Sequence, residues 1–600
     1  MSPTTDSAKP PMTLAQALRL VSENPPQSAS DTFQVALVCG FTPLHLQTFL
    51  TASLRRRMPA HHVTVSTGMY EDIAGTLRTA AAQRLDAIVL VIEWADLDPR
   101  LGFRRSGGWS PRSLPNIIEQ VRMQLAHVEQ LVAEAAVRSP LVLLLPTLPM
   151  PPLFPTAEWQ SSAFEAQLRA SIASFAERVS SNPRVRLVND QKVNAVAPAS
   201  ARLDMKALLA FGFPYQTPFA AHVAGILAEA VENRAPKKGL ITDLDDTLWG
   251  GIVGDDGAAG VSWDLEHHTQ GHALYQQLLD SLAEAGVLVG VASKNDPAVV
   301  DEAFARPDLL LSKARVFPIA VSWASKAQAV GRVLKAWNVH AESVVFVDDS
   351  ATEIAEVQAA HPAMECVLFS AEPAAVFDLL RKLRDEFGRR TITSEDEIRL
   401  ESLRQQSAID PGVAAESAGY SETLLASSQA TLSLVFSQDA DDARALELVN
   451  KTNQFNLNGK RFTSRAWADY LSDPSAFLLS AVYTDRFGAL GKIAVLAGRV
   501  NGDHAHIDTW VMSCRAFARR VEHQCLKALF ERWPISTIRL DYVDTTRNGP
   551  LGRFLDDVAK RSDAGMVVTK SDFEAACPPL YHTVLVTDGV EHERCARTTG

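Results

Sequence analysis

Short apolar runs alternate with longer amphipathic stretches over the first two-thirds of the 600-residue chain. FQVALVCGF, DAIVLVIEW and PLVLLLPTL have the length and composition of buried strands, whereas NIIEQVRMQLAHVEQLVAEAAV repeats apolar residues at helical spacing. Strands that alternate with helices predict a parallel sheet with helices on both faces. We therefore expect an α/β domain over residues 33–234.

The same alternation resumes after the polar break ENRAPKKG and continues over residues 238–390. Its four predicted strands are KGLITDLD, VLVGVAS, VFPIAVSW and SVVFVDD. Helical patterns lie between them, so this segment is expected to be a second α/β domain with a doubly wound parallel sheet.

The pattern changes in the last part of the chain. Residues 430–590 combine the helical stretch ADDARALELVNKTN with apolar runs joined through RVNGDHAHIDTW. Asn-Gly is a favoured two-residue hairpin turn, so antiparallel strands and an α+β domain are expected here. A Ser/Pro-rich flexible tail over residues 1–32 and a polar helical connector over 391–429 complete the predicted organisation.

Composition narrows the possible functions. Hydrophobic residues make up 46% of the chain and charged residues 21%, which suits globular domains with substantial cores. A net charge of -12 argues against a large nucleic-acid surface. No signal peptide or membrane span is predicted. The six cysteines show no zinc-ligand spacing, and a chain of this length does not need disulfides, so we expect a cytoplasmic protein.

Acidic residues follow two predicted strands of the second segment. Asp243 and Asp245 follow the first of them, and Asp348 and Asp349 follow the last. Ligands of open α/β sheets bind beyond the carboxyl ends of strands, so both pairs are expected at one edge. Crowded carboxylates repel one another, and a cation relieves that cost. Hard oxygen ligands favour magnesium, so these four aspartates predict a Mg²⁺ site.

Further polar residues are expected at the same edge. The strand VLVGVAS ends at Ser293, which Lys294 and Asn295 follow, and Lys326 begins the helix SKAQAVGRVLKAW. A metal, a lysine and a hydroxyl around a nucleophilic carboxylate form a plausible phosphoryl-transfer site. The alternative is a solvated acidic turn beside an ordinary helix lysine.

The order of these residues resembles the four signatures of the haloacid dehalogenase (HAD)-like phosphotransferase superfamily. The matching residues are Asp243-Leu-Asp245-Asp-Thr247, Ser293, Lys326 and Asp348-Asp349. The resemblance implies that Asp243 attacks phosphorus and forms an aspartyl phosphate. It implies that Asp245 acts as general acid/base and binds the metal through its backbone carbonyl.

The same resemblance implies that Asp349 ligates magnesium, with Asp348 beside it. Ser293 and Lys326 would hold phosphoryl oxygens. The predicted substrate-binding residues of this segment are Thr247, Ser293, Lys294, Asn295 and Lys326. Only the short excursion WGGIVGDDG follows the first signature, so little room remains for a large cap, and an open site could admit a substrate tethered to a protein.

The stretch DLDDTLWGGIVGDDG is also similar to the opening of the FkbH-like family. Four downstream blocks agree with that family: NKTNQFNLNGKRF, TDRFGALG, WVMSCRAFARRVE and DTTRNGPLGRFL. The resemblance runs from about residue 33 to 575. It implies that a glyceryl group is loaded from 1,3-bisphosphoglycerate onto the phosphopantetheine thiol of an acyl carrier protein, with phosphate release, to supply a polyketide starter, extender or tetronate unit.

The third segment resembles the GNAT acyltransferase fold, which holds the pyrophosphate of coenzyme A at a helix N-terminus. From Arg515 the chain reads Arg-Ala-Phe-Ala-Arg-Arg, so Arg520 fills the second small-residue position of the usual loop. An arginine there should hinder a pyrophosphate. This departure argues against ordinary acetyl-CoA use and permits a phosphopantetheine arm on a carrier protein.

Cys514 precedes that helix, and both the helix N-terminus and nearby Arg515 and Arg519 would lower the pKa of its thiol. Such a thiolate could carry the glyceryl group as a thioester. Cys366 is the alternative carrier, and a buried structural role is the alternative for either cysteine. Asn456 could bind a substrate hydroxyl or amide, or serve as a turn residue.

The first segment resembles an SGNH-type hydrolase fold in which VCGFTPLHL would carry the nucleophile. Its residues Gly40-Phe41-Thr42 contain no serine, and no DxxH closely precedes His222. We therefore expect a docking or structural domain. Two alternatives stay open for the whole chain: a small-molecule phosphatase fused to a coenzyme A-dependent acyltransferase, and a non-catalytic carrier-protein scaffold.

Overall fold

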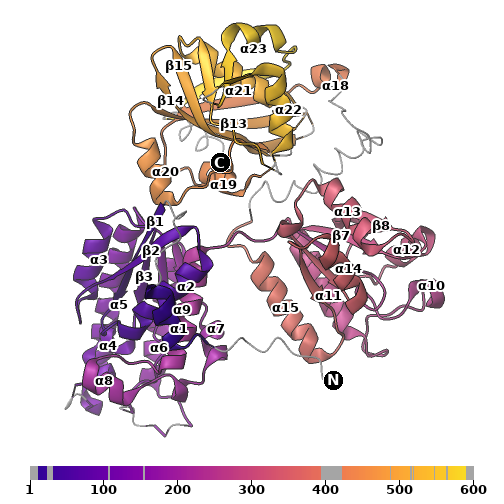
Figure 1. Cartoon of the computed structure of the whole chain (residues 1–600). Helices are drawn as coiled ribbons and strands as arrows, with labels where there is room; N and C mark the ends of the chain where they lie inside the picture. The colour runs from indigo at the N-terminus through magenta and orange to yellow at the C-terminus, as the bar shows by residue number, and fades with distance from the viewer. Residues whose placement is uncertain are drawn as a thin grey trace. The chain divides into compact units, whose positions relative to one another are not determined.

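The computed structural model describes most of the chain. The described residues are 11–22, 31–105, 109–152, 156–157, 159–392, 422–453, 455–486, 488–513, 516–517, 519–545, 548–562 and 565–589. The chain divides into two compact units, residues 1–234 with 463–466 and residues 235–462 with 467–600. The described residues form three sheets, one in each predicted segment (Figure 1).

The first sheet has the strand order β2-β1-β3-β4-β5, and every neighbouring pair is parallel. Its strands are β1 (Asp31–Cys39), β2 (His61–Thr67), β3 (Ala87–Val91), β4 (Leu141–Leu144) and β5 (Val185–Leu187). β3 and β4 are buried at every position, because helices cover both faces of a parallel sheet. The α/β fold predicted for this segment is confirmed.

Alternate residues of β1 belong to two different hydrophobic cores. Val35 and Leu37 pack with α2 and α9, while Ala36 and Val38 pack with α3, α5 and α6 on the other face. The helices of this unit are α1 (Leu14–Ser22), α2 (Leu44–Arg57), α3 (Ile73–Ala81), α4 (Trp94–Leu97), α5 (Leu114–Ala136), α6 (Ala163–Ser180), α7 (Asp190–Val196), α8 (Met205–Phe211) and α9 (Thr217–Glu232).

The flexible tail predicted for residues 1–32 is wrong for α1. Ala17 is fully buried in the core that α2 shares. Arg55 donates hydrogen bonds from Nη1 to the carbonyls of Leu20 (3.2 Å) and Val21 (2.8 Å), which satisfies the end of α1. Apolar residues at helical spacing outweigh the Ser and Pro content around them.

The second sheet is also parallel, with the order β10-β9-β6-β7-β8. Its strands are β6 (Gly239–Thr242), β7 (Leu288–Ser293), β8 (Val316–Val321), β9 (Val344–Asp348) and β10 (Glu365–Leu368). The four strands predicted from the sequence are all present. β6 is central, between β9 and β7, so the residues that follow these three strands lie at one edge.

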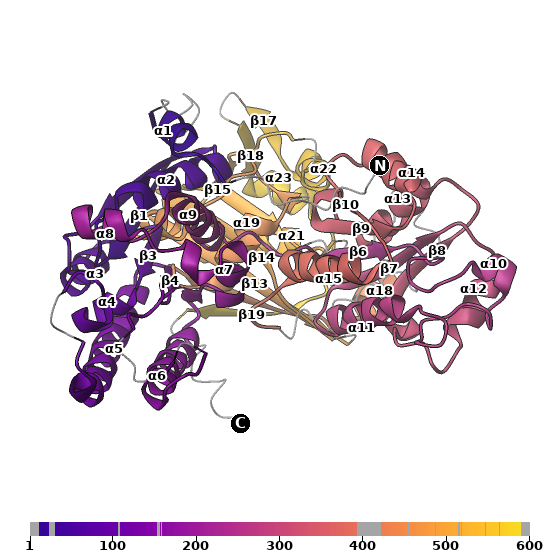
Figure 2. The same cartoon turned by 90° about the horizontal axis from the view of Figure 1, so that it is seen from below.

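Helices cover both faces of this second sheet (Figure 2). They are α10 (Val253–Asp256), α11 (Gln270–Glu284), α12 (Pro297–Phe304), α13 (Lys326–Trp337), α14 (Ala351–Ala360) and α15 (Pro373–Phe387). The ring of Trp337 lies against the backbone of the sheet, where a Cβ on Gly239 or Gly290 would approach it to 2.6 or 2.7 Å. These two glycines let the end of α13 pack closely on the strands and fix the direction of the helix.

The segment between β6 and α11, residues 243–269, folds back onto its own domain. Trp249, Val261 and Trp263 are buried in the core there. The guanidinium of Arg306 stacks on the Trp263 ring at 4.0 Å and donates a hydrogen bond to the carbonyl of Val261 (2.6 Å). Within residues 235–392, all of which are described, no cap-sized insertion therefore follows β6.

The third sheet is mostly antiparallel, as an α+β domain requires, with parallel pairs at β15–β16 and β11–β19. Its order is β17-β18-β16-β15-β14-β13-β11-β19, with β12 paired to β15. The strands are β11 (Thr431–Ser437), β12 (Phe455–Asn456), β13 (Ala476–Asp485), β14 (Gly488–Asn501), β15 (His504–Met512), β16 (Thr537–Leu540), β17 (Lys560–Ser562), β18 (Gly565–Thr569) and β19 (Thr583–Asp588).

The predicted hairpin is present, but its two-residue loop is Gly502-Asp503 and not the Asn-Gly pair. Asn501 of β14 pairs with His504 of β15, and Gly502 adopts the left-handed φ of 61° that the turn requires. The helices of this part are α18 (Glu422–Ser427), α19 (Ala443–Lys451), α20 (Ser464–Leu471), α21 (Val521–Arg532), α22 (Gly549–Val558) and α23 (Lys570–Ala576).

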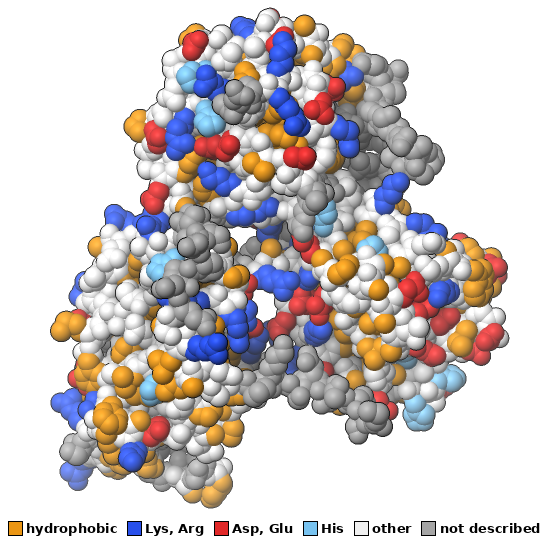
Figure 3. All heavy atoms as spheres, viewed as in Figure 1, with side chains coloured by type: hydrophobic (Ala, Val, Ile, Leu, Met, Phe, Trp, Pro, Cys, Tyr) orange, Lys and Arg blue, Asp and Glu red, His pale blue; other side chains and the backbone are white. Residues whose placement is uncertain are grey.

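Side chains of both charges and apolar side chains are spread over the face shown in Figure 3. Among the helices that the structure describes, none combines the length and the apolar composition needed to cross a bilayer.

Candidate active site

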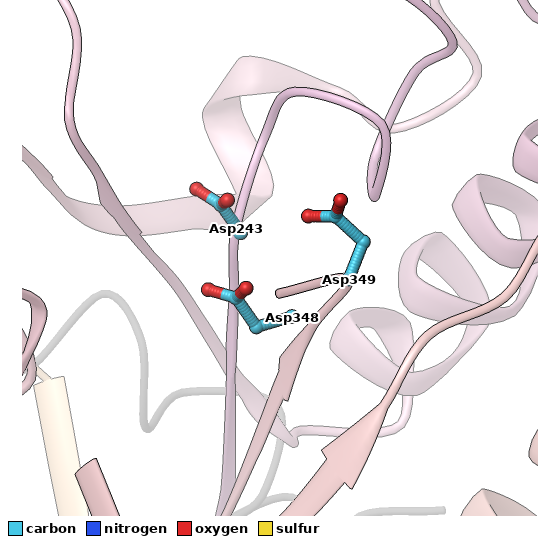
Figure 4. A group of neighbouring side chains, drawn as sticks. All are labelled: Asp243, Asp348 and Asp349. Carbon is cyan, nitrogen blue, oxygen red and sulfur yellow. The ribbon is translucent and has the colours of Figure 1, made fainter. Parts of the chain in front are cut away.

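Three aspartates meet at the carboxyl edge of the second sheet (Figure 4). Asp243 follows β6, and Asp348 and Asp349 stand at the end of β9. One carboxylate oxygen from each lies within 4.8 Å of the other two. They meet because β6 and β9 are neighbouring parallel strands in which Thr242 pairs with Val347. The sequence pattern predicts this convergence.

Lys326 places a positive charge between these acids. Its side chain is only 2% exposed, and its Nζ lies 2.8 Å from Asp243 Oδ1 and 3.0 Å from Asp348 Oδ2. The same Nζ lies 2.7 Å from Glu353 Oε2 and donates a hydrogen bond to the carbonyl of Ala292 (3.2 Å). Lys326 is the first residue of α13, so the packing of that helix on the sheet aims its ammonium at the acids.

Burial changes the protonation of this cluster. Burial raises the pKa of Asp243 above its ordinary value, although the charge of Lys326 opposes this. Burial and the neighbouring charge of Asp243 raise the pKa of Asp348 to about 7. Burial lowers the pKa of Lys326, but the two aspartates outweigh it and leave that pKa above its ordinary value. The acids therefore hold a proton near neutral pH that a divalent cation would displace.

The donor set fits a hard divalent cation. Asp243 Oδ1 and Asp348 Oδ2 are buried and face Lys326 Nζ at 2.8 and 3.0 Å. Asp349 is exposed, so the group opens to solvent on one side. Magnesium prefers oxygen ligands and usually combines one or two carboxylates with water and substrate phosphate. The three aspartates meet that requirement.

Thr247 connects the first acidic motif to Asp349. Its buried Oγ1 donates a hydrogen bond to Asp349 Oδ1 (3.2 Å) and accepts one from the Asp349 backbone N–H (3.0 Å). His272 Nδ1 donates to the Thr247 carbonyl (2.9 Å). The hydroxyl of Thr247 therefore positions Asp349, and the substrate contact expected of Thr247 stays a prediction.

The carboxylate of Asp245 is held by donors of its own. Its Oδ1 accepts hydrogen bonds from Trp249 Nε1 and from the Val253 N–H, each at 3.0 Å. Its Oδ2 accepts a hydrogen bond of 2.9 Å from Asn295 Nδ2. The carboxylate is therefore separate from the group of three aspartates, and a metal contact through the backbone carbonyl of Asp245 stays a prediction.

Asn295 and Ser293 form the third side of the site. Asn295 is buried and donates hydrogen bonds both to Asp245 and to Ser293 Oγ (3.1 Å). Asn295 thus positions these two residues, and the substrate contact expected of it stays a prediction. Ser293 is buried, and its hydroxyl hydrogen-bonds to Asp243, which favours the ionised form of that carboxylate.

Sequence reasoning missed Glu353. It lies in the first turn of α14 and joins two lysines, with Oε1 at 2.8 Å from Lys294 Nζ and Oε2 at 2.7 Å from Lys326 Nζ. Burial opposes its ionisation, but the two lysines lower its pKa below the ordinary value. The available signal was an acid three residues after the cap Ser350, which is common at any helix start.

Some of the site residues predicted in the third segment are not described. Cys514 and Arg515 lie outside the described residues. Burial raises the thiol pKa of the alternative carrier, Cys366, to about 11. Burial likewise raises the thiol pKa of the other described cysteines, Cys39, Cys525 and Cys577. At neutral pH these four thiols are therefore poor nucleophiles.

Asn456 takes the turn role that the sequence left open. Its Nδ2 donates a hydrogen bond to the carbonyl of Thr452 (2.9 Å), and its Oδ1 accepts from the N–H groups of Asn458 (3.3 Å) and Gly459 (2.7 Å). The residue is only 4% exposed. Its amide stabilises its own loop, and the substrate contact considered for it stays a prediction.

In the first unit, a carboxylate lies against Gly40, in the loop where an SGNH-type hydrolase would carry its nucleophile. A Cβ on Gly40 would lie 1.9 Å from Asp96 Oδ1. The hydroxyl of Thr42 donates a hydrogen bond to the carbonyl of Phe211 (2.8 Å). A side chain at position 40 would thus require Asp96 to move.

No family model matches the chain, and no curated protein matches it. One similar solved structure is the N-terminal part of the protein BF1531 from Bacteroides fragilis, which contains a phosphatase domain complexed with Mg. It is 17% identical, with a TM-score of 0.50, and the match covers 63% of this chain and 100% of that one. At this identity the likeness shows a shared fold over the part of the chain that it covers. A GDSL-like lipase from Parabacteroides merdae matches with 15% identity and a TM-score of 0.23, over 35% of this chain and 100% of that one.

The raised pKa of Asp348 predicts a pH-dependent effect of magnesium on stability. Without a cation, the folded state holds a proton that the unfolded state releases between about pH 4 and 7, so stability falls as pH rises through that window. Magnesium competes with that proton. We expect millimolar Mg²⁺, compared with EDTA, to raise the melting temperature by several degrees more at pH 8 than at pH 5.5. An equal gain at both values in calorimetry would contradict the competition.

Proposed function

We propose that this protein is a magnesium-dependent cytoplasmic enzyme that loads a glyceryl group from 1,3-bisphosphoglycerate onto the phosphopantetheine thiol of an acyl carrier protein, with phosphate release. The observation that carries the phosphoryl part is the meeting of Asp243, Asp348, Asp349 and Lys326 at one sheet edge. The phosphatase domain of the BF1531 structure supports the same chemistry. The FkbH-like blocks of the sequence support the glyceryl donor and the carrier.

In the phosphoryl step, Asp243 forms a bond to phosphorus while the bond from phosphorus to the leaving oxygen breaks. Asp245 gives that oxygen a proton, and it then takes a proton from the water that hydrolyses the aspartyl phosphate. Inorganic phosphate leaves, and both carboxylates return to their starting states. Lys326 and Ser293 hold phosphoryl oxygens, while Asn295 and Trp249 orient Asp245. A magnesium ion on Asp243, Asp348 and Asp349 would offset the charge of the phosphate.

In the acyl step, we assign the thioester to Cys514. Its thiolate would attack the acyl carbon of 1,3-bisphosphoglycerate, and the bond from that carbon to the phosphate oxygen would break and release inorganic phosphate. The carrier thiol would then attack the resulting thioester and release the Cys514 thiolate. The raised thiol pKa of Cys366 makes that alternative less favourable. Arg515 is proposed to assist as a nearby positive charge.

Arg520 weighs against the coenzyme A-dependent alternative. It adopts a left-handed φ of 59° just before α21 and donates a hydrogen bond of 2.6 Å to the carbonyl of Pro579. Its bulk at the helix start supports an acceptor without a pyrophosphate. The non-catalytic scaffold is disfavoured because a buried lysine among buried acids is costly to maintain without a function.

The decisive test incubates the full chain with 1,3-bisphosphoglycerate and Mg²⁺, with and without a holo-acyl carrier protein, and weighs both proteins by intact-mass spectrometry. We expect an acyl adduct on this protein that moves to the carrier. Phosphate release without any acyl adduct would exclude acyl transfer and would show that the protein acts only as a phosphatase.

Cys514→Ala is expected to remove the acyl adduct from this protein while phosphoryl chemistry at the Asp243 site continues, because the two steps use different residues. Intact-mass spectrometry measures the adduct. Cys366→Ala is the matched control and should keep it. An unchanged adduct on the Cys514 variant, with loss on the Cys366 variant, would transfer the role to Cys366.

A further inference from the structure

Exposed apolar side chains gather at the carboxyl edge of the first sheet. Helix α8 has no buried residue, and its residues Met205, Leu209 and Phe211 are exposed. Met205 and Leu209 lie four residues apart, so they share one face of the helix. Met69 and Tyr70, which come after β2, are exposed as well. We call these five residues the α8 surface; apolar side chains gather over α8 at the lower left of Figure 3, with Lys and Arg side chains beside them.

Hydrogen bonds and close packing bring these segments together. The Thr42 N–H donates a hydrogen bond to the carbonyl of Gly212 (3.1 Å), and its hydroxyl donates to the carbonyl of Phe211 (2.8 Å). Arg104 donates a hydrogen bond to the Tyr70 hydroxyl. A Cβ on Gly212 would lie 2.9 Å from Arg104 Nη1 and 3.0 Å from Tyr70 Cε2. The chain itself thus fills this edge, and since small-ligand sites are concave, the apolar side chains above it suit a large partner better.

The cations at the α8 surface are not matched by acids. Arg104, Arg105 and Lys206 are exposed. Among the residues that the structure describes, none of these three forms an ion pair with a carboxylate. Elsewhere on the same unit, by contrast, Arg57 pairs with Glu229 at 2.6 Å. The charge of the three cations is therefore available to an acidic partner.

The acids of the same segments are engaged locally. Asp72 and Asp204 each accept a hydrogen bond from a backbone N–H in the first turn of the helix that follows, α3 and α8 respectively. Glu71 accepts a hydrogen bond from the Tyr70 hydroxyl. Met, aromatic residues and Arg are also the residue types enriched in protein interfaces. The α8 surface therefore has the composition of a docking site for a protein with acidic and apolar side chains.

We propose that the α8 surface docks the acyl carrier protein through an acidic, partly apolar face of that protein. This inference rests on the proposed function, which supplies the carrier. Opposite charges would speed the encounter, and attachment to this chain would raise the effective concentration of the carrier thiol. A second copy of this chain fits less well, because a symmetric interface would bring Arg104 and Lys206 of both copies together.

The test measures acyl transfer from 1,3-bisphosphoglycerate to a purified holo-acyl carrier protein by the full chain with Mg²⁺. We expect Leu209→Glu to raise the KM for the carrier by about tenfold or more with kcat unchanged, because it removes an apolar contact and repels an acidic partner. Transfer to free pantetheine, which has no protein surface, should keep the wild-type rate. Lys206→Glu should also raise the KM for the carrier, and added salt should reduce its difference from wild type.

Met123→Glu is the matched control. Met123 is 52% exposed on α5 of the same unit and Leu209 is 54% exposed, so the control should keep the wild-type KM for the carrier. An unchanged KM in Leu209→Glu, or an equal rise in both variants, would overturn the inference and leave the proposed function standing. Loss of self-association in light scattering, with an unchanged KM, would assign the α8 surface to a second copy instead. Absence of acyl transfer to both the carrier and pantetheine by the wild type would overturn the proposed function, and the inference with it.

Discussion

Replacement of Asp243 by asparagine is expected to lower the rate of phosphate release by about 10³-fold or more, with the fold intact. An amide is nearly the same size as a carboxylate but cannot form the bond to phosphorus. The substitution also removes one of three acids around Lys326, and two of them, Asp348 and Glu353, remain to pair with its ammonium. Stability should therefore change little. Release of phosphate from the substrate and a far-ultraviolet circular dichroism spectrum measure the two effects.

Asp246→Asn provides the matched control within the same motif. Asp246 is exposed, has a left-handed φ of 49° and accepts a hydrogen bond from the Gly251 N–H (2.9 Å). Asparagine tolerates that backbone conformation and keeps an acceptor oxygen. This variant should retain most of the activity. Wild-type turnover by Asp243→Asn would exclude the nucleophile assignment, and equal losses in both variants would indicate a disturbed loop.

The convergence of Asp243, Asp348 and Lys326 could be predicted because each residue follows or begins an element that is visible in the apolar pattern. The topology of parallel strands then determines the edge at which they meet. The same reasoning predicts the hairpin at Asn501, because the turn chemistry is local. Short-range patterns therefore account for the scaffold of the site.

Partners of buried polar groups could not be predicted in this way. The sequence does not indicate that the side chains of Thr247 and Asn295 bond to Asp349 and Asp245. Glu353 joins two lysines, one that follows β7 and one that begins α13, and nothing in its local sequence indicates this. Such contacts depend on side-chain directions set by packing between distant segments, which a linear pattern does not contain.

These contacts nevertheless explain how the site tolerates so much charge. Three charged groups of the site are each held by a neighbour: Thr247 holds Asp349, Asn295 holds Asp245, and Glu353 holds Lys326. Because these charged side chains are already held in place, little conformational entropy is lost when a phosphate binds. Such preorganised charges are what stabilises a phosphoryl transition state electrostatically.

Lys326→Met is expected to destabilise the second domain by about 3–5 kcal/mol at pH 8 without metal, because it leaves buried acids without their shared cation. The loss should shrink at pH 5.5. Without Lys326, the pKa of Asp348 and Asp243 would rise further, so the folded state would take up protons that the unfolded state lacks, and stability would fall as pH increases. Urea denaturation at both pH values measures this.

Lys335→Met, at an exposed position of the same helix, should change stability by no more than about 0.5 kcal/mol. Equal, pH-independent losses in the two variants would show that Lys326 does not hold the acids together.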